Sequence, residues 1–134
     1  MSISMQNHGG YTEKYDNFDE KARMLGINYP DVNQYLSLIH ESDSALEYLI
    51  SYFEKVDDPV EIVFFGDHQP SLSSSFYPYL NGKGLGGLKL SELENLYTVP
   101  FFIWTNYDSG KESVELTSLN YLSTLALERA GIAL

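Results

Sequence analysis

One run of residues, Val60–Pro70, constrains the fold more than any other part of the chain. Its first part, Val60–Phe65, is β-branched and aromatic, which predicts a strand buried on both faces. The run then breaks at Gly66, and Asp67 and His68 follow directly. Because glycine allows a sharp turn with no side chain in the way, we expect a carboxylate and an imidazole just past the carboxyl end of the strand. These two side chains are candidate metal ligands. The alternative is a turn in which the carboxylate caps backbone amides and the imidazole packs at the rim.

Helical and strand patterns on either side of this run predict an α/β fold. Apolar residues recur at helical spacing from about Val32 to Lys55, with Asp31 as a candidate N-cap. Ser2–Gln6 alternates weakly and is predicted as a short strand. The order strand, helix, strand is the βαβ pattern, which predicts a mostly parallel sheet with a right-handed crossover and flanking helices.

The second half of the chain is predicted to add one strand and two helices. Val99–Thr105 is a third apolar run typical of a buried strand, and Thr117–Ala130 has the stripe of an amphipathic helix with Gly131 as its C-cap. Ser71–Lys89 is rich in Ser, Gly, Tyr and Pro, which indicates a long functional loop. A Ser-x-x-Glu capping box predicts a short helix over Glu92–Leu96.

Polar residues stand at the end of each predicted strand. In an open parallel sheet, ligands bind outside the carboxyl ends of the strands, so neighbouring strands would bring these clusters together. The clusters are Asn7-His8, Asp67-His68 and Asn106-Tyr107-Asp108.

Each cluster also has an interpretation without chemistry. His8 is either a contact for a substrate anion or a hydrogen-bonded loop histidine. His40 and Asp43 are expected to form an exposed pair within the long helix, and Asn106 and Asp108 to form turns. The aromatic residues of the strands are expected in the core. They are Phe64, Phe65, Phe101, Phe102 and Trp104.

Composition bounds the class of protein. A chain of 134 residues with 43% hydrophobic content is long enough for a single domain spanning residues 1–134. It contains no cysteine, which excludes disulfides and thiolate metal sites. Its net charge of −11 and its 8 Lys and Arg residues exclude a typical nucleic-acid binder. The sequence has no signal peptide and no membrane-spanning run, so we expect the chain itself to be soluble.

Four blocks in order resemble the lipoteichoic acid synthase-like phosphoglycerol transferases, in the sulfatase branch of the alkaline phosphatase superfamily. Gly-Asp-His alone is a weak motif, but four blocks spread over most of the chain form a strong one. The blocks are Met5–Tyr11, Tyr35–Leu46, Phe64–Pro70 and Val99–Asn106.

The resemblance implies a partial alkaline phosphatase/sulfatase-like fold and a specific chemistry. Family members act at the extracellular face of the membrane and transfer glycerol phosphate from phosphatidylglycerol to a polyol-phosphate or glycan acceptor, through a Thr nucleophile. One divalent cation, usually manganese, with magnesium, calcium or zinc as alternatives, is held by a Glu, the Thr and an Asp-His pair. Asp67 and His68 match that pair as metal ligands, and His8 matches the histidine that holds the substrate phosphate or glycerol.

The family's Thr nucleophile and Glu ligand lie upstream of the first matching block, so we expect this chain to be a C-terminal portion of the catalytic domain, inactive by itself and weak in metal binding. A sulfatase or phosphodiesterase of the same superfamily is one alternative function. The other is a catalytically inactive α/β interaction module. A sheet without its amino-terminal strands would expose an edge and an apolar face, so we also expect the chain to self-associate.

Overall fold

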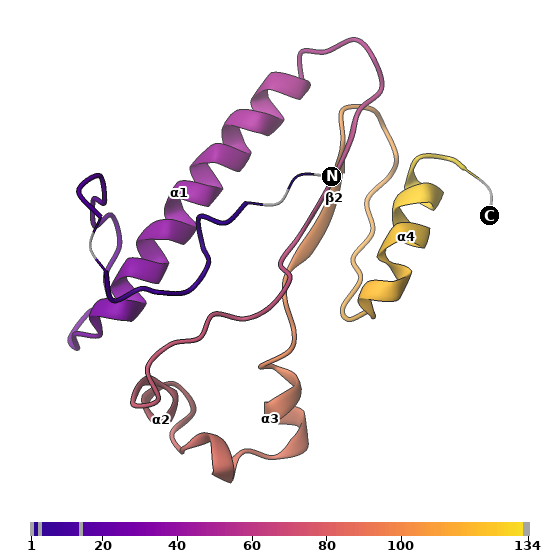
Figure 1. The fold of residues 1–134 in the computed structure, drawn as a ribbon. Coiled ribbons are helices and arrows are strands. Elements are labelled where there is room, and N and C mark those ends of the chain that lie inside the picture. The colour runs from indigo at the N-terminus through magenta and orange to yellow at the C-terminus, as the bar shows by residue number, and fades with distance from the viewer. Residues whose placement is uncertain (1, 3, 14, 133–134) are drawn as a thin grey trace. The chain divides into compact units, whose positions relative to one another are not determined.

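A computed structural model describes residues 2, 4–13 and 15–132 (Figure 1). Contacts divide the chain into two compact units. The first, here called the loop unit, comprises Met1–Leu49 and His68–Thr98, and the second, the sheet unit, comprises Ile50–Asp67 and Val99–Leu134. The single domain expected from the sequence stays a prediction.

The longest element is helix α1, Pro30–Phe53. The sequence predicted it two residues too late at both ends. Proline suits the first position of a helix because its missing N–H would have no partner there and its φ is already helical. Asp31, predicted as the N-cap, lies inside the first turn instead, and its carboxylate Oδ2 accepts a hydrogen bond from the backbone N–H of Ser73 at 2.7 Å. The acidic side chain therefore connects the start of α1 to the segment before α2.

The segment predicted as one long loop contains two short helical elements. Helix α2 spans Phe76–Asn81 and a 3₁₀ turn, η1, spans Leu85–Gly87. The ring of Phe76 is buried and lies edge-on to Tyr29, with ring centroids 5.3 Å apart. The loop prediction is therefore wrong over α2, because a buried aromatic contact stabilises a helix that the composition of the segment does not predict.

Helix α3, Leu90–Glu94, begins and ends two residues before the predicted helix. The predicted capping box of Ser91 and Glu94 is wrong. Glu92 is the capping carboxylate, and its Oε2 accepts the backbone N–H of Lys89 at 2.6 Å. Its interaction with Lys83, whose Nζ lies 2.7 Å away, lowers the pKa of the Glu92 carboxyl, with the bond from Lys89 as the second cause.

The predicted strand at Ser2–Gln6 is absent from the residues of that segment that the structure describes, 2 and 4–6; residue 3 lies outside them. The backbone turns here instead, since the N–H of His8 donates to the carbonyl of Met5 at 3.1 Å and the N–H of Gln6 to the Ser4 hydroxyl at 3.3 Å. The predicted βαβ unit is therefore wrong at its first strand.

The sheet of the sheet unit has two strands, β1 (Glu61–Phe65) and β2 (Phe101–Thr105), both within two residues of their predicted positions. They are antiparallel, with Glu61 opposite Thr105 and Phe65 opposite Phe101. The predicted parallel arrangement is wrong for this pair because the connection returns to the end of the sheet where β1 finishes, so β2 runs back along it. The coarser prediction of an α/β chain with helices and a sheet is confirmed.

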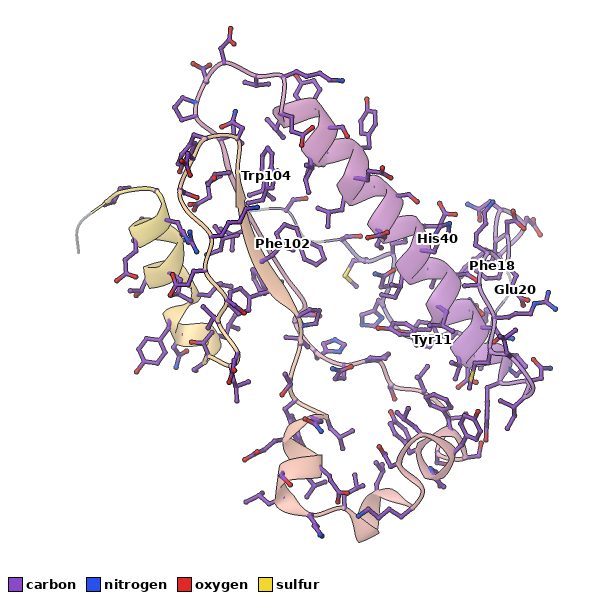
Figure 2. The ribbon with its side chains drawn as sticks, turned by 180° about the vertical axis from the view of Figure 1, so that it is seen from behind. Tyr11, Phe18, Glu20, His40, Phe102 and Trp104 are labelled. Carbon is purple, nitrogen blue, oxygen red and sulfur yellow. The ribbon has the colours of Figure 1, made fainter. Side chains whose placement is uncertain are left out.

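The aromatic residues of the strands are less buried than the sequence predicted. Phe64 and Phe102 stack with ring centroids 5.2 Å apart, yet Phe64 is 39% exposed and Phe65 is 38% exposed. Phe102 and Trp104 project from the same side of β2, as alternation along a strand requires (Figure 2). The side chains at the end of β1 are thus partly exposed to solvent, and a two-stranded sheet offers few neighbouring strands to bury them. The prediction of a strand buried on both faces is therefore wrong for β1 in this structure.

The chain closes with a 3₁₀ turn, η2 (Leu119–Tyr121), and helix α4 (Leu122–Arg129). The helix predicted over Thr117–Ala130 begins five residues later, because the 3₁₀ turn η2 precedes it. Its C-cap is Ala130 and not the predicted Gly131, which follows with a φ of 74° that favours glycine and donates its N–H to the carbonyl of Glu128 at 3.0 Å. Arg129 Nη1 donates to the carbonyls of Ser109 and Gly110 at 2.7 and 2.8 Å, which connects α4 to the loop after β2. Of the described helices, none combines the length and apolar character required to cross a bilayer.

Candidate functional site

The predicted metal-binding pair follows β1 directly, and the preceding glycine sets its position. Gly66 donates its N–H to the carbonyl of Pro100 at 3.1 Å, which extends the strand pairing by one residue. A Cβ at this position would lie 3.2 Å from the Cβ of Val99. The φ of Gly66 does not lie in the left-handed region. Glycine is therefore favoured here by the close approach of β2's leading segment, which refines the sequence argument based on a sharp turn.

Asp67 and His68 are both exposed. Nδ1 of His68 lies 2.9 Å from the carbonyl oxygen of Gln69. Because a carbonyl only accepts, this contact favours the proton on Nδ1, and in the neutral imidazole of that tautomer the lone pair that a metal ion requires is on Nε2. The Gln69 side-chain amide donates in turn to the carbonyl of Thr98. The imidazole is thus oriented by backbone of the loop unit in a tautomer suited to ligation.

His8 lies on a segment that side chains attach to α1. The Asn7 amide and the Ser42 hydroxyl exchange two hydrogen bonds, of 2.9 and 3.1 Å. The Tyr11 hydroxyl donates to the Asn7 carbonyl at 2.7 Å, and the buried Tyr11 ring lies 5.6 Å from that of Tyr35 on the helix. His8 itself is exposed between these two anchors. An exposed imidazole on an anchored segment is a suitable group for contacting a substrate.

A cavity of about 780 Å³ lies next to His8 within the loop unit. Its lining comes from α1 and from two irregular segments before it, around residues 5–11 and 15–21. The described residues between 12 and 29 contain no helix or strand. The sequence revealed no chemistry in them, so the contribution of Tyr15, Phe18 and Lys21 to this cavity was missed. The only signal was an aromatic recurrence, Tyr11, Tyr15 and Phe18, in an otherwise polar stretch.

The three predicted site residues are divided between the units. His8 and His68 belong to the loop unit, and Asp67 belongs to the sheet unit. Convergence of His8 with the other two around one pocket therefore stays a prediction. A carboxylate and an imidazole are suitable donors for a divalent cation such as Mn²⁺. Among the residues that the structure describes, no group of three or more His, Asp or Glu side chains is placed to hold a metal ion, so the fit is one of donor chemistry and covers part of a coordination sphere.

Asn106 and Asp108, the polar residues after β2, hydrogen-bond to the backbone around them. Oδ1 of Asn106 accepts the N–H of Val60 at 2.8 Å, and its Nδ2 donates to three carbonyls, those of Phe53, Val56 and Asp58, at 3.2, 2.9 and 2.9 Å. Asp108 accepts the N–H of Gly110 at 3.1 Å, which is the turn expected from the sequence. His40 is exposed on α1 (Figure 2), and its pairing with Asp43 stays a prediction.

Comparison with known proteins identifies the family. The sulfatase family model matches residues 1–132. The "Capsular polysaccharide biosynthesis protein RkpI" of Rhizobium meliloti (strain 1021) is 40% identical over 76 residues, which are 57% of this chain and 12% of that protein. The "Putative cyclic beta-1,2-glucan modification protein" of the same strain is 22% identical over 139 residues, which cover 98% of this chain and 21% of that protein.

No solved structure matches the chain significantly. The chain thus spans about an eighth and about a fifth of the length of these two relatives. The family match nevertheless extends over almost every residue, including the segments that carry His8, Asp67 and His68. The chain belongs to the sulfatase family.

Proposed function

We propose that this chain is part of a metal-dependent phosphoglycerol transferase that modifies a cell-envelope polymer or glycan at the outer face of the membrane. Membership of the sulfatase family supports metal-assisted chemistry on a phosphate or sulfate ester. The names of the two relatives, in capsular polysaccharide biosynthesis and in cyclic glucan modification, support a glycan-related substrate. The four blocks that resemble lipoteichoic acid synthase-like enzymes support glycerol phosphate as the transferred group.

The observation that carries this proposal is the exposed Asp67-His68 pair directly after β1. Asp67 would provide an anionic oxygen ligand, and His68 would provide Nε2, held in the required tautomer by the contact of Nδ1 with the Gln69 carbonyl. When bound, a divalent cation such as Mn²⁺ would neutralise charge on the phosphate and lower the pKa of an attacking hydroxyl. His8 would hold the phosphate or the glycerol as a hydrogen-bond donor.

The remaining ligands and the Thr nucleophile are proposed to belong to other segments of a longer protein. This agrees with the short share of each relative that the chain covers. A site with two ligands holds a metal ion weakly because its supporting hydrogen bonds and coordination are incomplete. We therefore expect the chain alone to bind Mn²⁺ weakly and to catalyse no transfer.

Calorimetric titration of the chain with Mn²⁺ tests the ligand assignment. We expect weak binding that Asp67→Ala and His68→Ala each abolish, while Asp43→Ala, which removes an exposed carboxylate from α1, leaves it unchanged. In the complete protein that contains this chain, Asp67→Ala should abolish transfer of glycerol phosphate from phosphatidylglycerol. Full activity of that variant would refute the role of Asp67.

The same complete protein separates the alternative functions. Hydrolysis of sulfate esters or phosphodiesters without transfer to a glycan would identify a sulfatase or phosphodiesterase. Absence of any turnover together with absence of Mn²⁺ binding would identify an interaction module.

The exposed aromatic side chains of β1 also support self-association of the isolated chain, and a monomer mass that does not change with concentration in light scattering would contradict it.

A further inference from the structure

We infer that the cavity beside His8 is a binding site for a neutral saccharide. Its role as the place where the acceptor glycan is held rests on the proposed function, but the binding itself is independent of any reaction. The cavity has about 780 Å³ and lies entirely within the loop unit. This volume is typical of small-molecule sites and exceeds what a single glycerol unit occupies.

The cavity has a preformed floor and two anchored walls. Gln34, Leu38 and Glu41 line it from α1, and their spacing places them on one face of that helix. The wall around His8 is attached to α1 through Asn7 and Tyr11, as described above. The opposite wall is attached by Ser37, a buried residue whose Oγ accepts the N–H of Lys21 at 3.0 Å and of Ala22 at 3.1 Å. A site with both walls fixed loses little entropy when a ligand binds.

Aromatic and amide groups in the lining suit a sugar. Tyr15 lines the cavity and is 61% exposed, and Phe18 is half-buried beside it. Figure 2 shows Phe18 in the segment next to the N-terminal half of α1. An exposed ring offers a flat apolar surface for the C–H face of a pyranose, and the amides of Gln6 and Asn17 offer both donors and acceptors for hydroxyl groups.

Away from His8, the charges of the lining select against an anionic ligand. Lys21 is the one basic side chain among the lining residues other than histidine, and its Nζ pairs with the Asp19 carboxylate at 2.7 Å. The hydrogen bond with Asp19 raises the pKa of Lys21, as do the charges of Asp19 and, to a smaller extent, Glu41. Two carboxylates thus face one cation that already has a partner, and the whole chain carries a charge of −11. A polyanion would be repelled, whereas the hydroxyl groups of a neutral sugar can donate to Glu41.

Titration of the ¹⁵N-labelled chain with laminaritetraose, a neutral β-linked glucose tetrasaccharide, tests this inference by NMR. We expect saturable shifts of amides in residues 5–11 and 15–21, and a Kd at least tenfold weaker for Tyr15→Ala. Tyr97→Ala is the matched control, because Tyr97 is 85% exposed in the same unit and does not line the cavity. Tyr15 is largely exposed, and its contribution to the local turn is its backbone carbonyl, which accepts the N–H of Phe18 at 2.9 Å, so the variant should keep the fold.

A parallel titration with sn-glycerol 3-phosphate tests the charge argument. We expect shifts several-fold smaller than those caused by the tetrasaccharide at equal concentration, and an increase for Glu41→Lys. Equal or tighter binding of glycerol 3-phosphate at the amides of residues 15–21, or no response to the tetrasaccharide, would overturn the inference, whereas shifts confined to the amides next to His8 would fit the phosphate contact proposed for that residue. Saccharide binding does not involve Asp67, so loss of Mn²⁺ binding with retained saccharide binding would count against the proposed function alone, and the reverse result against this inference alone.

Discussion

The loop unit and the sheet unit hold their segments in place by different means. In the loop unit, three polar side chains of α1 are buried, and each bonds to the backbone of the irregular segment before the helix: Asn33 to Met24, Gln34 to Glu13, and Ser37 to both Lys21 and Ala22. In the sheet unit, a regular backbone ladder of five residue pairs is reinforced by the stacked rings of Phe64 and Phe102.

This difference indicates how the stability of each unit should respond to the loss of a side chain. An irregular segment cannot pair its backbone groups with itself, so a few side chains must satisfy them, and loss of one side chain should release one segment. A ladder is cooperative, so a substitution that weakens its start should reduce the stability of the whole unit. Trp104 on β2 is the single tryptophan of the chain and reports on the sheet unit by fluorescence.

The largest effect is expected from Asn106→Ala. The substitution removes four side-chain hydrogen bonds that attach the 53–60 segment to the end of β2, and it leaves the N–H of Val60 without its 2.8 Å partner. We expect the free energy of unfolding to fall by about 2–3 kcal/mol, because partly buried polar groups lose their partners. Urea denaturation followed by Trp104 fluorescence measures this change.

Asp108→Ala is the matched control for that experiment, because it removes one exposed hydrogen bond, to Gly110, from the same loop. Its effect should stay within about 0.5 kcal/mol, as is usual for a surface substitution. Equal losses in the two variants would mean that Asn106 has no special part in fixing the ladder.

A smaller and local effect is expected from Ser37→Ala. The variant loses the hydroxyl that accepts the N–H groups of Lys21 and Ala22. We expect a local cost of about 1–2 kcal/mol for two unsatisfied donors. Hydrogen exchange by NMR should show faster exchange at these two amides, while the unfolding transition reported by Trp104 stays unchanged.

Ser44→Ala provides the comparison within the same helix. Ser37 donates its hydroxyl to the carbonyl four residues earlier, that of Asn33, at 2.9 Å, and Ser44 does the same to His40 at 3.0 Å. Ser44, however, is exposed, and among the described residues it bonds to no other segment. Its removal should leave the exchange of Lys21 and Ala22 unchanged. A shift of the Trp104 transition by Ser37→Ala would contradict the separate behaviour of the two units.

The sequence predicted three of the regular elements well because their patterns are local. The apolar recurrence over α1 and the β-branched runs of β1 and β2 located these elements to within two residues. The relative direction of the strands depends on how the 66–100 connection returns, which no local pattern encodes, and the antiparallel pairing was therefore missed. The described residues of the 2–6 segment form no strand, since two short-range hydrogen bonds outweigh a weak alternation there.

The place of the candidate site was predictable in part. The positions of Asp67 and His68 just after a strand were predicted because they follow a strong strand pattern through a glycine, and their role as metal ligands stays a prediction. The cavity beside His8 was not predicted, because much of its lining comes from segments without periodicity. Those segments are held by Gln34 and Ser37, which are buried polar residues of α1, whereas the sequence pattern of α1 indicates only its apolar stripe. The four bonds of Asn106 were also invisible, since asparagine after a strand predicts only a turn.

The smallest effect, of opposite sign, is expected from Glu61→Gln in the sheet unit. Oε2 of Glu61 is buried at the start of β1 and has no hydrogen-bond partner among the described residues. Burial raises the pKa of the Glu61 carboxyl, and the charge of Arg129 partly opposes this. A raised pKa in the folded state means that the ionised form is disfavoured there, so the cost is absent below the ordinary pKa of the group and is complete above the raised one.

Glu61→Gln should therefore stabilise the sheet unit at neutral pH, and this gain should vanish as the pH falls below the ordinary range for glutamate. Urea midpoints from Trp104 fluorescence across that pH range measure it, with the exposed Glu115→Gln as a control that should show no such trend. A gain independent of pH would mean that side-chain packing, and not the buried charge, limits the stability of the ladder at this end.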